Sequence, residues 1–180
     1  ASAYGNEVSV GKAIAESGLD RGEIFVTTKL WNDVRGFDET IAAFEQSLER
    51  LGLDYADLYL IHWPNPLKYR TCWKQANAQS WAALEKLYND GRIKAIGVSN
   101  FRPKHFDALL ETAKIVPMVN QIRLCPGDVH EETVEFCRKN NILLEGYSPF
   151  GQGKAFGVEE IKQLAEKYGK TVSQICVRWS

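Results

Sequence analysis

The chain has 180 residues, of which 25% are charged and 44% are hydrophobic, and its formal net charge is −1. This length is sufficient for one domain with a sizeable core. The balanced charge argues against binding to a nucleic acid backbone, and no apolar run approaches the roughly 20 residues of a membrane helix. We therefore expect a protein without a nucleic acid or membrane partner.

Short apolar segments alternate with segments of helical periodicity along the chain. After a first helical pattern around Val10, Ala13 and Ile14, strand–helix pairs follow one another five times. The strand-like segments are mostly not alternating, as is typical of parallel strands that are buried on both faces. They are EIFVTTK (23–29), ADLYLIH (56–62), KAIGVSN (94–100), MVNQI (118–122) and ILLEGY (142–147).

Five strand–helix units are compatible with a doubly wound open sheet or with part of an eightfold barrel. No G-x-G-x-x-G motif follows the first strand, which weakens the open dinucleotide-binding fold. The barrel needs eight strands and about 250 residues, so five strands are three too few. One long segment, residues 63–79, separates the second strand from its helix and is rich in aromatic residues, which favours a functional loop.

Polar residues stand at or near the ends of these strands. Each of them has an ordinary structural explanation, such as a solvated lysine, a buried histidine or a helix cap. In a parallel barrel, however, all these ends meet on the face where active sites are built. The residues are Lys29, His62, Ser99, Asn100, Gln121 and Tyr147.

The four cysteines form no C-x-x-C pair, which favours reduced thiols and a cytoplasmic protein. Cys125, His130 and Cys137 lack the paired spacing of structural zinc ligands, so we expect no metal site.

Six motifs carry a resemblance over essentially the whole chain. YGNE, TTKLW, DLYLIHWP, GRIKAIGVSNF, VNQI and YSPFGQGK resemble the aldo-keto reductase superfamily, in particular its branch of 2,5-diketogluconate reductases and prostaglandin F synthase-like proteins. The resemblance implies an α/β fold, the (β/α)8 TIM barrel, of which about five of eight strands are present here. It also implies one barrel domain over residues 1–180 that is truncated at both ends.

The resemblance assigns three catalytic residues for carbonyl reduction. Tyr4 would be the general acid that protonates the carbonyl oxygen, and the nearby ammonium of Lys29 would favour its phenolate form and so ease proton donation. His62 would orient the carbonyl by a hydrogen bond, while the cofactor NADPH delivers hydride.

The resemblance also assigns the binding residues. Ser99, Asn100 and Gln121 would hold the nicotinamide carboxamide, and Tyr147 would stack on the ring. Ser148, Phe150, Gly151, Gln152 and Lys154 would lie along the pyrophosphate. Trp31 and Trp63 would wall an apolar substrate pocket, although both could also be packing residues of the barrel rim.

The chain departs from the family pattern after Gln121, where Arg123 and Cys125 replace the usual residues. The family's aspartate partner of the lysine would precede residue 1, and the lysine and arginine that hold the adenosine 2′-phosphate would follow Ser180. We therefore expect the chain to be a fragment that is inactive alone, because a partial barrel exposes two strand edges and can self-associate.

Three functions remain open from the sequence. The first is an NADPH-dependent reductase of aldehydes, dicarbonyls or keto-sugars, monomeric when intact. The second is a non-catalytic NADP(H)-binding regulatory module with the same fold, which would not need Tyr4, Lys29 and His62 together. The third, an unrelated phosphate-binding barrel enzyme, lacks a visible anion site in its late loops.

Overall fold

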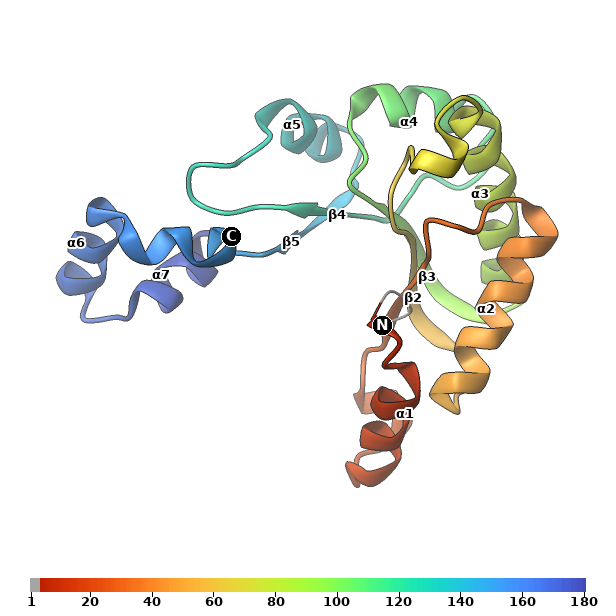
Figure 1. The fold of residues 1–180 in the computed structure, drawn as a ribbon, viewed down its shortest axis with the longest axis horizontal. Helices are drawn as coiled ribbons and strands as arrows, with labels where there is room; N and C mark the ends of the chain where they lie inside the picture. Colours follow the sequence, from red (N-terminus) through yellow and green to blue (C-terminus); the bar gives the residue numbers. More distant parts are fainter. Residues whose placement is uncertain (1–3) are drawn as a thin grey trace. The chain divides into compact units, whose positions relative to one another are not determined.

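The structure is a computed structural model and describes residues 4–180 (Figure 1). The chain divides into two compact units, Ala1–Val119 and Asn120–Ser180, which we call unit 1 and unit 2. The prediction that residues 1–180 form a single domain remains a prediction.

Unit 1 contains three parallel strands and the helices that follow them. Its strands pair in the order β1, β2, β3, with Lys29 opposite Leu60 and Leu60 opposite Gly97. The elements are α1 (Glu7–Glu16), the 3-10 turn η2 (Arg21–Glu23), β1 (Thr27–Leu30), α2 (Phe37–Leu51), β2 (Ala56–Ile61), η3 (Leu67–Tyr69), α3 (Trp73–Asn89), β3 (Ile93–Ser99) and α4 (Pro103–Leu110).

The two faces of this sheet carry different residues, because side chains alternate along each strand. Helices α2 and α3 cover one face (Figure 1). On that face Tyr59 meets Phe44 edge-on, with ring centroids 4.9 Å apart. On the opposite face, Leu58 and Leu60 pack with Val119. Lys29 is paired with Leu60 across β1 and β2, so its side chain lies on this second face, one residue before the end of β1.

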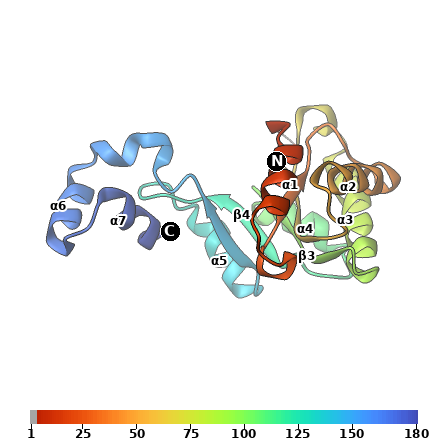
Figure 2. The same cartoon turned by 90° about the horizontal axis from the view of Figure 1, so that it is seen from below.

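Unit 2 contains the later strands and two terminal helices. The elements are β4 (Val119–Arg123), whose first residue closes unit 1, then α5 (Glu131–Lys139), β5 (Leu143–Tyr147), the irregular turn η4 (Gly151–Gly157), α6 (Glu159–Tyr168) and α7 (Val172–Trp179). The backbone N–H of Leu124 donates to the carbonyl of Tyr147 at 3.2 Å and so joins the ends of β4 and β5. Helices α6 and α7 lie side by side (Figure 2) and pack Ile161 and Cys176 together with Ala155.

The order of strands agrees with the sequence prediction, and most strand ends differ from it by one residue, but two boundaries differ by more. The first strand begins at Thr27, four residues later than predicted, because residues 21–23 form a 3-10 turn in which Glu23 accepts a hydrogen bond from the backbone of Asp20. The loop after β2 is shorter than predicted, since α3 already begins at Trp73.

Candidate functional site

The ends of β1 and β2 bring two predicted site residues into contact. The rings of Trp31 and His62 stack with their centroids 4.9 Å apart and an interplanar angle of 24°. The backbone N–H of His62 donates to the carbonyl of Leu30 at 3.3 Å, which continues the strand ladder by one residue. Trp31 and His62 therefore form the next row above Lys29 and Leu60 on the same face.

The imidazole of His62 is held in its neutral form. Its pKa is lowered from 6.5 to about 4, chiefly by burial and in addition by the positive charges of Lys29 and Arg35. Its Nδ1 atom is buried and has no hydrogen-bond partner among the described residues. At neutral pH this ring can donate one hydrogen bond and accept another, which suits the orientation of a polar ligand.

Asn100 connects the end of β3 to the end of β2. Its backbone adopts a left-handed conformation with φ of 64°, and asparagine tolerates this region better than most residues. Its side-chain nitrogen donates to the carbonyl of His62 at 3.0 Å and to the hydroxyl of Ser99 at 3.1 Å. Three predicted site residues, His62, Ser99 and Asn100, thus belong to one hydrogen-bonded group.

Tyr4 lies in a turn directly before α1, and its side chain is 84% exposed. The start of α1 is fixed by Glu7, which is buried and accepts hydrogen bonds from Thr28 at 2.8 Å and Arg50 at 2.7 Å. Sequence reasoning missed this anchor between α1, β1 and α2, although Glu7 belongs to the YGNE motif. The predicted convergence of the Tyr4 phenol with Lys29 and His62 remains a prediction.

The loops that carry Trp31 and Trp63 are joined by a residue that sequence reasoning also missed. Arg35 is buried and donates from Nη1 to the carbonyl of Trp31 at 2.9 Å and from Nη2 to the carbonyl of Trp63 at 2.6 Å. Burial lowers the pKa of Arg35 to about 10, so it stays charged at neutral pH. No sequence motif marks it, because the two carbonyls that it joins lie 4 and 28 residues away and are brought together only by the fold.

In unit 2, Gln121 and Tyr147 lie on the neighbouring strands β4 and β5. The side-chain nitrogen of Gln121 donates to Glu145 at 2.7 Å. Burial raises the pKa of the Tyr147 phenol, and the positive charge of Arg123 opposes this shift. Arg123 also pairs with Asp128 at 3.2 Å.

The segment after Tyr147 is a succession of tight turns. Positive φ angles occur at Ser148 (53°), Gly151 (55°), Gln152 (58°) and Gly153 (92°). The backbone N–H of Gly151 donates to the carbonyl of Ser148 at 2.9 Å, and those of Gly153 and Ala155 donate to Phe150. Turns of alternating handedness form concave sets of backbone N–H groups that bind anions, and exposed Lys154 lies within this segment.

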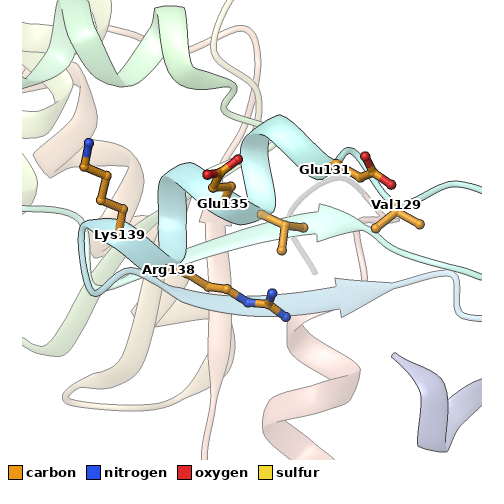
Figure 3. A pocket seen from close by; sticks show the side chains of 6 residues that line it. Val129, Glu131, Glu135, Arg138 and Lys139 are labelled. Atoms are coloured by element: carbon orange, nitrogen blue, oxygen red, sulfur yellow. The ribbon is translucent and has the colours of Figure 1, made fainter.

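A hollow runs along α5 (Figure 3), but it contains none of the predicted site residues. Val129 and Glu131 lie at the start of this helix, and Arg138 and Lys139 lie at its end. The chemistry-bearing residues are therefore elsewhere, at the strand ends.

Two further properties concern residues 4–180 only. Within this range, no three His, Cys, Asp or Glu side chains gather as a metal site requires. None of the described helices is both long enough and apolar enough to span a bilayer.

Comparisons with known proteins agree with the resemblance seen in the sequence. The family model described as the aldo/keto reductase family matches residues 1–180. The chain is 49% identical over 179 residues to the glyoxal reductase of Bacillus subtilis (strain 168), and the match covers 99% of this chain and 62% of that protein. It thus spans about three fifths of the length of this curated relative.

Solved structures of the same family superpose on the chain. An aldo/keto reductase from Brucella melitensis has a TM-score of 0.91 and 44% identity, with 99% of this chain and 66% of that chain covered. A mutant of Gox0644 in complex with NADPH has a TM-score of 0.87 and 41% identity, with 98% and 61% covered. These matches confirm the predicted α/β fold, a (β/α)8 barrel present in part, and the chain belongs to the aldo/keto reductase family.

Proposed function

We propose that the protein is an NADPH-dependent oxidoreductase that reduces small aldehydes or ketones, such as dicarbonyls or keto-sugars, to alcohols. The observation that carries this proposal is the stack of the His62 imidazole on Trp31 at the strand ends, one row beyond Lys29 and Leu60 on the same face of the sheet. Membership in the family and the likeness to a glyoxal reductase support it.

The residues of this chain fit a nicotinamide dinucleotide. Ser99 and Asn100 present a hydroxyl and an amide at the end of β3, and Gln121 presents a second amide on β4. We propose that these groups hold the carboxamide and that Tyr147 stacks on the ring. When bound, NADPH would supply the hydride, and the protein would supply placement and polarity.

The turns after β5 suit the pyrophosphate. Gly153 has a φ of 92°, and a Cβ added there would meet no atom within 4 Å, so the backbone is open on that side. We propose that backbone N–H groups of residues 148–154 other than those of Gly151 and Gly153, which serve the turns themselves, face the phosphate oxygens, with Lys154 as a counter-charge. Ser148, Phe150, Gly151 and Gln152 belong to this proposed segment.

The catalytic roles follow from the chemistry of the three side chains. We propose that His62 donates a hydrogen bond to the substrate carbonyl, because its ring is neutral at the pH of the cell. Tyr4 would then give its phenolic proton to the developing alkoxide, and the Lys29 ammonium would stabilise the phenolate that remains. Trp31 and Trp63 would wall the apolar part of the substrate.

Further expectations for the protein are a single barrel domain, a monomeric state and a cytoplasmic location. The other candidate function, an NADP(H)-binding module without catalysis, would need the cofactor residues but not the trio of Tyr4, Lys29 and His62.

The substitution Tyr4→Phe tests the proposal in the full-length protein. Removal of the phenolic proton should lower kcat for methylglyoxal by about 100-fold or more, because general acid catalysis contributes on this scale. The dissociation constant for NADPH, measured by quenching of protein fluorescence, should stay unchanged. Tyr168→Phe, at an exposed position on α6, is the matched control and should retain full activity.

Two results would contradict the proposal. If wild-type protein binds NADPH but reduces no aldehyde or ketone, the binding module is the better explanation. If Tyr4→Phe is as active as wild type, Tyr4 is not the general acid.

A further inference from the structure

Arg35 is a buried cation whose partners are all uncharged. Its side chain is 4% exposed, and it forms no ion pair with any residue in the range 4–180. Instead its nitrogens donate to the carbonyls of Trp31 at 2.9 Å, Val34 at 2.6 Å and Trp63 at 2.6 Å, and to Asn77 Oδ1 at 3.3 Å. A planar guanidinium is the side chain that can serve so many acceptors at fixed angles.

Asn77 extends this arrangement to helix α3. Its side chain is 2% exposed, its oxygen accepts from Arg35, and its nitrogen donates to the carbonyl of Pro64 at 2.7 Å. The loop after β1 and the loop after β2 are therefore both tied to one guanidinium, which α3 holds in place. We call Arg35 and Asn77 the loop bracket.

The bracket lies next to the residues that the proposed function gives to the substrate. Trp31 stacks on His62. Trp63 directly follows His62 in the chain and is 41% exposed. Both indoles are attached to backbone whose carbonyl accepts from Arg35. The separation of the two indoles thus depends on the geometry of one side chain.

Stability alone does not explain an arginine at this place. Burial of a charge without a charged partner is costly, and even buried ion pairs can often be replaced by apolar residues of similar volume without loss of stability. What an apolar residue cannot do is fix two carbonyls of separate loops at hydrogen-bond distance. The arrangement therefore favours a role in positioning.

We propose that Arg35 is a positioning residue that sets the spacing of Trp31 and Trp63 and thereby selects carbonyl substrates with an apolar group that fits between them. This proposal rests on the proposed reductase function. A small dicarbonyl that contacts His62 alone gains little from the two indoles. An aromatic carbonyl compound would depend on both indoles for its binding.

The test compares Arg35→Lys with Arg178→Lys in the full-length protein, using methylglyoxal and phenylglyoxal as substrates. Lysine keeps the charge at position 35 but loses the fork that reaches both loops. Because one indole would no longer be held against the phenyl ring, KM for phenylglyoxal should rise by about tenfold, which is the scale of one lost aromatic contact. KM for methylglyoxal and both kcat values should change by less than about twofold. Arg178 is exposed on α7, and Arg178→Lys should change neither KM nor kcat for either substrate.

A second readout does not depend on activity. Protein labelled with 5-fluorotryptophan should give fluorine resonances for Trp31 and Trp63 that shift in Arg35→Lys, while the resonance of buried Trp81 stays in place. Asn77→Ser removes the amide that bonds to Arg35 and Pro64 and should shift the same two resonances. It takes the place of Arg35→Lys in this test if the Arg35→Lys protein does not fold.

The results separate the two proposals. Equal loss of kcat for both substrates with unchanged KM values would show a structural role only and would overturn the positioning proposal, as would unmoved Trp31 and Trp63 resonances. A wild-type protein that reduces neither substrate would overturn the reductase function and the substrate selection with it, whereas shifted resonances would still support the loop bracket.

Discussion

Strands β2 and β5 have similar apolar sequences but very different surroundings. All six residues of β2 are buried, between β1 and β3 and under the helices of unit 1. In β5 no residue is buried, and Leu143 is 67% exposed. An apolar run thus predicts a strand, whereas its burial depends on neighbours that the run itself does not specify.

The largest expected effect comes from removal of a leucine in each strand. Leu60→Ala should lower the free energy of unfolding by about 3 kcal/mol, because Leu60 is fully buried against Leu58 and Val119. Leu143→Ala should change it by less than about 0.5 kcal/mol, since this side chain is mostly in solvent. Urea titration of both variants at pH 7 measures the difference. Similar losses would mean that β5 is as well packed in solution as β2.

The glycines of β3 and β5 sharpen the same comparison. A Cβ added at Gly97 would stand 2.5 Å from the carbonyl oxygen of Val119, so Gly97→Ala should destabilise unit 1 by about 2 kcal/mol through overpacking. A Cβ at Gly146 would meet its nearest atom, the Cβ of Leu124, at 3.4 Å. Gly146→Ala should therefore be close to neutral, within about 0.5 kcal/mol. Thermal unfolding of the two variants distinguishes them, and equal shifts of Tm would contradict the close contact at Gly97.

A third expected effect is a loss of unit 1 stability in acid. Burial lowers the pKa of His62 and of His105 from 6.5 to about 4, so the unfolded chain binds more protons than the folded one between these values. Stability should be constant above pH 6.5 and should fall as the pH drops towards 4. Hydrogen exchange of residues 56–62, corrected for intrinsic rates, should show this loss, and His62→Gln should reduce its slope. An unchanged slope in both His62→Gln and His105→Gln would refute the assignment.

Much of the fold was predictable because parallel strands and helices differ in periodicity. The five strands were found with errors of one residue at most of their ends, whereas the start of β1 was missed by four residues. There, Ile24 and Phe25 are apolar and resemble strand residues, yet a local side-chain hydrogen bond between Asp20 and Glu23 forms a turn before them. Short polar side chains compete with regular structure in this way.

The candidate site was predictable where one residue marks one strand end, as at His62 and Asn100. It was not predictable where a buried polar side chain serves distant backbone. Arg35, Asn77 and Glu7 make their contacts over 13 to 43 residues, apart from those of Arg35 within its own loop. Such partners are decided by the packing of loops and helices, so no local pattern identifies them.

The amide of Asn100 gives the site a property that neither loop provides. Since it binds the backbone carbonyl of His62 and not the ring, it joins the ends of β2 and β3 without using either ring nitrogen of the imidazole. A change in the loops that carry Trp31 and Trp63 can therefore alter the substrate pocket while the backbone of His62 stays tied to Asn100. Through Asn100, substrate selectivity could thus change in evolution while the backbone of the proposed catalytic residue His62 keeps its place.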